Sequence, residues 1–425
     1  MEASDNAAQV ARSRRTASVL LAVLVILYAV AVVVKIAREP QHFQLTFRTC
    51  YAAAQAFSQG LDPYDPPNLH KLDPGVQAAY GYPPITLYFF LPFAALPFQT
   101  AYVAYLALKV LCLTGLVWMW HRWFLKRSLD GLFLLVCLLG FNFALYWDVA
   151  GGNVVLIEQV LLWAGLYAYL HGHLKTFAVL VALAASFKLA LILFLALLVI
   201  RRGRRRRYAL FLGTGVYAAM LALSSVFYSE MTIVFLQNLQ KSTLGLHRGD
   251  LLRPSHPPAA WWLLNELSGK VCERLGAPMV GEPVAVVGYL TLLAVVTLVT
   301  WAAVRRFLHV FRDDGYLSVI MLFCLAYLLV LPRLTPGSYI LALPAAYYIA
   351  LKTRHVHAVL VLAGAAAIST SATQPPGFNL LKDVLPAYYP LLLTFVLWVI
   401  GVRFCMRAGA QAESHPEPAL PPAPG

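Results

Sequence analysis

Long apolar runs recur along this chain of 425 residues, and they constrain its fold more than any other feature of the sequence. Hydrophobic residues make up 60% of the chain and charged residues only 12%. The hydrocarbon core of a bilayer needs about 20 apolar residues from each helix that crosses it. The sequence therefore predicts an all-α polytopic membrane protein and excludes the ordinary soluble globular classes.

The apolar runs predict about 12 transmembrane helices. Their bounds are 18–36, 84–97, 100–120, 130–147, 152–170, 175–200, 208–227, 284–304, 316–333, 338–351, 356–371 and 386–404. We expect residues 1–17 to form a cytoplasmic tail, 18–404 the transmembrane domain, and 405–425 a Pro-rich disordered tail on the cytoplasmic side. The first run lacks a convincing cleavage site, so we expect it to remain as an anchor.

The net charge of +14 comes from short basic clusters that lie between apolar runs. The clusters are "RSRR" (12–15), "RRGRRRR" (201–207), "RRFLHVFR" (305–312), "KTRHVH" (352–357) and "RFCMR" (403–407). Clusters of this kind mark cytoplasmic loops under the positive-inside rule. They are not interleaved with stacking aromatic residues, so we expect no nucleic-acid partner. With the N-terminus inside, the two long loops 37–83 and 228–283 fall outside.

The first long loop begins with a predicted helix. Phe43, Phe47, Tyr51, Ala54 and Phe57 recur at intervals of three and four, with polar residues between them. This spacing predicts an amphipathic helix that lies in the plane of the membrane interface. The stretch "GLDPYDPP" (60–67) then ends the helix in turns. An ordinary interfacial loop and a substrate site are both compatible with this pattern.

Charged residues within apolar runs are costly in a bilayer and are therefore candidate functional residues. Lys188 lies near the middle of the run 175–200, where it could bind a phosphate, pair with a carboxylate, or extend its amine toward the membrane surface, and the first two are favoured over the third. Lys109 gives a weaker version of the same argument. Glu158 follows the "GGN" turn at 151–153 and is a possible partner of Lys188. A structural glycine turn beside a satisfied ion pair would explain this region equally well.

Cationic side chains also lie at the predicted outer surface. Arg333 ends an apolar run, and an arginine can bind a phosphate through two N–H groups. The second long loop contributes His247 and Arg248 among other basic residues. Cations beside a membrane suit an anionic lipid substrate such as a phospholipid or a polyprenyl phosphate. The six cysteines are scattered and show no ligand spacing, so neither a zinc site nor a disulfide framework is indicated. We expect no metal and no cofactor.

Several segments, taken in order, resemble glycosyltransferase family 87, a family of polytopic enzymes of the GT-C class. They are "FRTCYAAAQAFSQGLDPYD", "YGYPPITLYFFLPFAALP", "DVAGGNVVLIEQVLLWAGLY", "LAASFKLALILFL" and "LPRLTPGSYILALPAAYY". Each segment alone is weak evidence, but the ordered set is fairly specific and covers roughly residues 18 to 350.

The resemblance implies a GT-C-like fold and an activity. A polyprenyl-phosphate-linked hexose, typically mannose, would donate its sugar to a lipid or glycan acceptor on the outer face, in a bacterial plasma membrane. An Asp early in the first outer loop would act as general base, and the acceptor hydroxyl would attack with inversion. Cationic groups would stabilise the departing phosphate, so no metal is needed. Membrane lipids complete the expected partners.

The chain departs from the family pattern at the position expected for the base. The match falls on Thr46, and a threonine hydroxyl cannot act as a base near neutral pH. The nearest acids are Glu39, Asp62 and Asp65, of which the last two are the candidate replacements. The late segment "TPGSY" (335–339) also differs from the family pattern. The candidate substrate-binding residues are Arg48, Tyr64, Asn153, Lys188, His247, Arg248 and Arg333.

Three functions are compatible with these features. The chain could be an active transferase with a displaced base, which we favour. It could instead be a catalytically degenerate relative that binds a polyprenyl-linked glycan as an accessory subunit. A transporter of lipid-linked sugars would explain a lysine within the membrane, but it would not explain the long outer loops.

Overall fold

The structure is a computed structural model, and it describes residues 2–76, 78–126, 130–201, 203–244, 259–276, 281–311, 315–353 and 385–414. These residues form helices joined by turns, and none of them forms a strand. The predicted all-α class is confirmed. The predicted span at 356–371 and the candidates His247 and Arg248 lie outside the described residues.

The described residues of the first half of the chain form twelve helical elements. They are α1 (Glu2–Arg38), α2 (Leu45–Ser58), α3 (Pro66–Leu72), η1 (Pro84–Thr86), α4 (Leu87–Ala94), α5 (Phe98–Met119), the π-helical turn η2 (Trp120–Leu125), α6 (Gly131–Gly151), α7 (Val155–Leu170), α8 (Leu174–Phe187), η3 (Leu189–Ala196) and α9 (Leu197–Ile200).

The described residues of the second half form further helices. They are α10 (Arg205–Phe227), α11 (Ser229–Leu244), α12 (Ala260–Arg274), α13 (Gly281–Phe311), α14 (Tyr316–Val330), η5 (Pro336–Leu341), α15 (Ala342–Thr353) and α17 (Leu385–Ser414). The predicted tail boundary at 405 is wrong for residues 405–414, because they continue α17. Apolar and small residues persist to Ala410, which allows the helix to extend.

Among the described residues, six helices are long and apolar enough to cross a membrane. Their spans are Thr16–Arg38, Phe98–Leu125, Gly131–Gly151, Arg205–Phe227, Gly281–Phe311 and Tyr388–Ala410, and five shorter apolar helices accompany them. The run 175–200, predicted as one span, is instead divided into α8, η3 and α9. The division occurs at Lys188, which has an extended backbone (φ −140°, ψ 101°).

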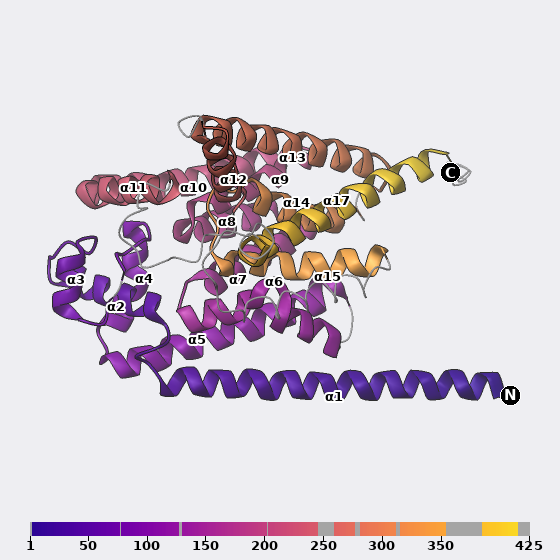
Figure 1. The fold of residues 1–425 in the computed structure, drawn as a ribbon, viewed down its shortest axis with the longest axis horizontal. Helices are drawn as coiled ribbons and strands as arrows, with labels where there is room; N and C mark the ends of the chain where they lie inside the picture. The colour runs from indigo at the N-terminus through magenta and orange to yellow at the C-terminus, as the bar shows by residue number, and fades with distance from the viewer. Residues whose placement is uncertain are drawn as a thin grey trace.

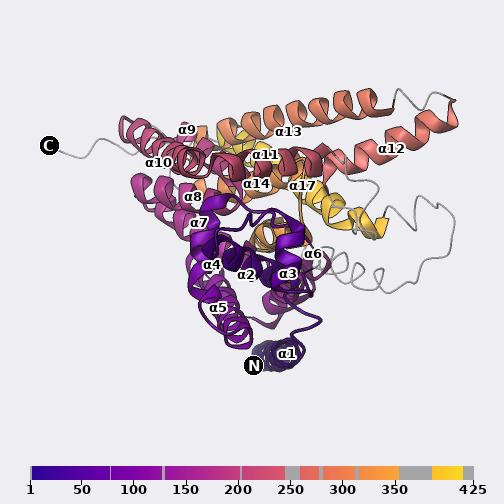
Figure 2. The same ribbon diagram turned by 90° about the vertical axis from the view of Figure 1, so that its left-hand side faces the viewer.

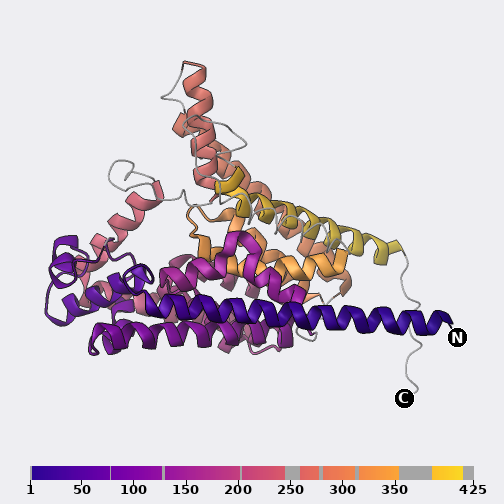
Figure 3. The ribbon, with the colours of Figure 1, turned by 60° about the horizontal axis from the view of Figure 1, so that its bottom comes forward.

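The helices of the first long loop and the adjoining α4 gather at one end of the molecule. There α2, α3 and α4 lie together, whereas α1 begins and α17 ends at the opposite end (Figure 1). The first-loop end faces the viewer in Figure 2. The paired helices α12 and α13 project from the bundle (Figure 3). The first loop thus covers the ends of the neighbouring apolar helices.

The helix predicted at the start of the first loop is present as α2, but its surroundings differ from the prediction. Its apolar side packs against protein rather than lying open in the interface plane. The ring of Phe47 stacks on that of Tyr105, with centroids 4.3 Å apart, and the edge of Phe93 meets it at 5.8 Å. Offset and edge-on ring pairs of this kind stabilise a packed core. α2 is therefore fixed to α4 and α5.

Candidate active site

Three interrupted helical segments lie beneath the first loop. α6 and α7 are separated by the turn at Gly152, α8 and η3 by Lys188, and α14 and η5 by residues 331–335. α7 packs against α8 and η5, and α6 packs against η5. Irregular backbone at membrane depth is tolerated only where protein buries it or where it lines a cavity. The breaks therefore mark the part of the bundle that can hold a polar ligand.

Lys188 points from its break toward the break before η5. Its Nζ donates a hydrogen bond of 2.7 Å to Oγ of Ser338. The same hydroxyl accepts a 3.1 Å hydrogen bond from the backbone N–H of Thr335, which caps η5. Arg333 lies close enough to Lys188 for the two charges to interact. Two cations from separate elements are thus brought together, an arrangement that an anion between them would stabilise.

Glu158 lies on the first turn of α7 and is almost completely buried, at 1% exposure. It interacts electrostatically with Lys188, the partner predicted for it, but no ion pair joins these two side chains. Its Oε1 has no hydrogen-bond partner among the described residues. The hydroxyl of Tyr327, within electrostatic range of Glu158, is also buried and unpartnered. Unpartnered buried oxygens are costly, so this region is suited to a hydroxyl-rich ligand.

The ion pair at the centre of the bundle joins Lys109 to Asp148, and both side chains are fully buried. Lys109 also donates to the backbone carbonyl of Asn153. The hydroxyl of Tyr105 lies 3.2 Å from the carbonyl oxygens of both Gly152 and Asn153 and shares its one proton between them. α5 therefore holds the "GGN" turn in place. Lys109 was a weaker candidate than Lys188, and the signal for this pair was a lysine within the run 100–120 and an aspartate directly after the run 130–147.

The glycine at the centre of this turn allows α2 to approach closely. Gly152 has φ +72°, in the left-handed region, and an added Cβ would lie 2.9 Å from Cα of Gln44 and 3.0 Å from Cβ of Phe47. The backbone N–H of Gln44 donates to the carbonyl of Ala150 at 2.5 Å. The turn therefore packs directly against the start of α2, which carries Thr46.

We expect Gly152→Ala to lower the free energy of unfolding by about 3 kcal/mol, because the methyl group adds overpacking to left-handed strain. Gly276→Ala is the matched control, since Gly276 has a similar φ of +73° and open space around it. The control should cost only about 1 kcal/mol. Thermal unfolding in detergent measures both, and equal losses would contradict the packing contribution.

Hydrogen bonds of two tyrosines connect the rest of the first loop to the "GGN" turn. The hydroxyl of Tyr64 donates to the carbonyl of Tyr82 at 2.5 Å, and the hydroxyl of Tyr82 reaches Oδ1 of Asn153 at 3.4 Å. Burial raises the pKa of Tyr64 and of Tyr82, so both phenols stay neutral. Tyr82 also lies within electrostatic range of Arg333. The candidates Tyr64, Asn153, Lys188 and Arg333 thus belong to one connected region.

The two candidate bases have different surroundings. Oδ1 of Asp62 accepts the backbone N–H of Tyr64 at 2.9 Å, so this exposed carboxylate shapes the turn. Asp65 is half-buried and precedes α3, but its side chain does not cap the helix and joins none of the ion pairs of the described residues. Thr46 is half-buried on the first turn of α2.

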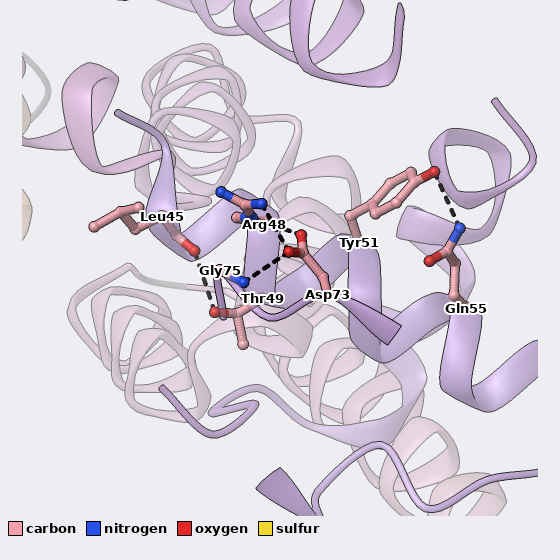
Figure 4. Close-up of polar contacts among 7 residues, drawn as sticks. All are labelled: Leu45, Arg48, Thr49, Tyr51, Gln55, Asp73 and Gly75. Carbon is pink, nitrogen blue, oxygen red and sulfur yellow. Dashed lines mark hydrogen bonds and ion pairs between the residues drawn. The ribbon is translucent and has the colours of Figure 1, made fainter. Parts of the chain in front are cut away.

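Arg48, a candidate for substrate binding, is held by an internal partner. Its Nε and Nη2 donate to the two carboxylate oxygens of Asp73 at 2.5 and 2.7 Å, as Figure 4 shows. The backbone N–H of Gly75 donates to the same carboxylate at 2.9 Å. The guanidinium also lies over the ring of Phe98, 5.2 Å from its centroid. This bidentate pair fastens the segment after α3 to α2, and Asp73 is not among the residues predicted from the sequence to form the site.

Burial alone would raise the pKa of Asp73, but the hydrogen bonds and charge of Arg48 and the Gly75 amide outweigh it and hold the pKa below 3.8. A lowered pKa means that the carboxylate stabilises the fold at neutral pH and loses this effect as the pH falls through the folded-state pKa.

We expect Asp73→Asn to lower the free energy of unfolding by about 1 kcal/mol at neutral pH and to match the wild type in strong acid. Unfolding measured at both pH values checks this, and an equal gap at both would contradict it.

Comparison with known proteins identifies the family. Residues 80–332 match the sequence profile of glycosyltransferase family 87. The chain belongs to glycosyltransferase family 87. No curated protein and no solved structure matches it significantly. The matched region contains the "GGN" turn, Lys188 and the segment up to residue 332, so the family assignment and the interrupted helices concern the same part of the bundle. The chain is thus a membrane glycosyltransferase by family.

Proposed function

We propose that this glycosyltransferase moves a hexose, with mannose as the proposed sugar, from a polyprenyl-phosphate donor to a lipid or glycan acceptor. The observation that carries the proposal is the convergence of Lys188 and Arg333 at two helix breaks beneath the first loop. A departing phosphate develops negative charge, and fixed cations in a poorly hydrated site stabilise it. The basic clusters lie at the predicted cytoplasmic side, so we propose that the site faces outward.

In this mechanism the acceptor hydroxyl loses its proton as it attacks the anomeric carbon. We propose Asp65 as the general base, because its half-buried carboxylate has no competing role in the turn. Asp62 would orient the loop through its hydrogen bond to the Tyr64 backbone. Attack opposite the leaving phosphate inverts the anomeric configuration. The unpartnered oxygens of Glu158 and Tyr327 would bind hydroxyl groups of the sugar.

The cationic role of Lys188 predicts a specific kinetic loss. We expect Lys188→Met to lower the rate of sugar transfer about 100-fold, because the leaving phosphate loses one charge-stabilising donor. Lys175→Met is the matched control, since Lys175 lies exposed at the other end of α8. Transfer of labelled mannose from polyprenyl-phosphate mannose in proteoliposomes measures both. A Lys188 variant as active as the control would contradict the proposal.

A non-catalytic role as a binder of lipid-linked glycans is the second candidate, and Thr46 favours it because the residue expected to act as base is missing. The two functions differ in donor turnover. A binder would retain polyprenyl-phosphate mannose, with weaker binding in the Lys188 variant, and would never release its sugar. A transferase consumes the donor when an acceptor is present.

A further inference from the structure

A second polar site lies at the end of the bundle opposite the first loop. A cavity of about 440 Å³ opens there, lined by Gly172, Leu174, Arg201, Gly203, Arg204 and Arg205. α10 leads from this cavity to Tyr228, whose hydroxyl contacts that of Tyr88 in α4. At about 1.5 Å per residue, α10 separates the cavity from the first-loop end by roughly 35 Å. This is the end that the positive-inside rule predicts to be cytoplasmic.

Arg201 lines this cavity, and its side chain is held in one orientation. Its guanidinium stacks 3.6 Å from the ring centroid of Tyr316 and 4.8 Å from that of Tyr169. Nη2 donates to the carbonyl of Tyr169 at 2.8 Å, but the buried Nε has no acceptor among the described residues. Stacking of this kind fixes the orientation of the guanidinium plane. The cavity is therefore lined by a cation whose orientation is fixed.

Described residues between α9 and α10 border the same cavity. Nη1 of Arg206 donates to the carbonyls of Val199 and Arg201 at 3.0 and 2.8 Å, which pins the turn. Arg204 and Arg205 are exposed and line the cavity. Neither forms a hydrogen bond or an ion pair through its side chain with the described residues, and no carboxylate lines the cavity. Three arginines thus line one cavity that has no carboxylate among its lining residues.

The position of these arginines increases the need for an anion. Arg205 is the first residue of α10, and no acidic residue lies in the first turn of this helix. The N-terminus of a helix carries partial positive charge, so cations there are unfavourable unless an anion compensates them. A phosphate oxygen would accept hydrogen bonds from guanidinium groups and offset their repulsion.

We propose that this cavity binds the phosphate of an anionic membrane lipid. The cavity adjoins the first residue of α10, whose span Arg205–Phe227 is apolar enough to cross a bilayer. It therefore lies at the depth of lipid headgroups, with an apolar helix surface beside it for the acyl chains. Its volume falls in the range of small-molecule sites. The site is separate from the proposed transfer reaction and does not depend on it.

The test compares single charge removals within one basic run. Arg204→Gln, Arg205→Gln and the control Arg207→Gln each remove one charge, but Arg207 does not line the cavity. The full chain in phosphatidylcholine nanodiscs is supplied with phosphatidylglycerol, and native mass spectrometry counts the lipid that stays bound. We expect each cavity variant to weaken phosphatidylglycerol binding about fivefold and the control to leave it unchanged.

Three results would overturn the proposal. One is equal weakening by the Arg207 variant, which would indicate diffuse attraction to the membrane surface. Another is undiminished binding in both cavity variants. The third is ready displacement of the bound lipid by soluble glycerol phosphate, which would assign the cavity to a soluble phosphate compound. The three arginines concerned are exposed, so the variants should fold, and an unchanged melting temperature verifies this.

Discussion

Replacing Asp65 with Asn should slow sugar transfer by about 10³-fold, the size of effect expected when a general base is removed. The amide cannot accept the proton of the acceptor hydroxyl, but its shape is almost unchanged. Because Asp65 neither caps α3 nor joins an ion pair of the described residues, the fold should not suffer. The donor should bind as before. Transfer of labelled mannose in proteoliposomes, with donor binding measured in parallel, gives both quantities.

Two further variants make this test specific. Asp62→Asn should lower transfer by only about tenfold, through a looser turn, because an amide oxygen can still accept the Tyr64 N–H. Adding Thr46→Asp to the Asp65 variant should restore part of the activity, because it returns a carboxylate to the position expected from the family pattern. If Asp65→Asn were fully active, a different group would be the base.

Breaking the Lys109–Asp148 pair should produce the largest loss of stability in the molecule. Both side chains are fully buried, so Lys109→Met would leave an isolated carboxylate in the apolar bundle. Removing one partner of such a pair costs about 4 kcal/mol. The "GGN" turn would also lose the Lys109 donor to the Asn153 carbonyl. We expect the variant to accumulate poorly and to melt well below the wild type in detergent.

The double variant Lys109→Met/Asp148→Leu separates charge burial from other effects. Apolar replacement of both partners removes the isolated charge, so most of the stability lost in the single variant should return. A remaining deficit of about 1 kcal/mol is expected, because the Asn153 carbonyl stays without its lysine donor. A double variant as unstable as the single one would show that desolvated charge is not the cause.

The bounds of a helix could be predicted from the sequence where a long apolar run determines them. The run 208–227 matches α10, and the run 316–333 matches α14 closely, because an apolar stretch of that length has few alternatives in a membrane. The run 175–200 was wrong as a single helix. A lysine in its centre is stabilised by a polar partner, and the break at Lys188 brings its amine to Ser338, 150 residues away in the chain.

The pairings within the site could not be read from local patterns. Lys109 and Asp148 are 39 residues apart, and only the packing of α5 beside α6 and α7 brings them together. Arg48 was expected to bind substrate, yet Asp73 lies 25 residues further on and binds its guanidinium. Lys188, Arg333 and Asn153 could be proposed as candidates from the sequence because a charge or a glycine turn within an apolar run is costly wherever its partner lies.

One measurement tests the central proposal most directly. Purified chain in proteoliposomes is given polyprenyl-phosphate mannose with an acceptor lipid extract, and the labelled sugar and the free polyprenyl phosphate are followed together. We predict that both products appear in equal amounts with the wild type and fall about 100-fold with Lys188→Met. Donor that binds tightly but remains intact with every acceptor and every hexose tried would contradict the proposal and assign the chain a binding role.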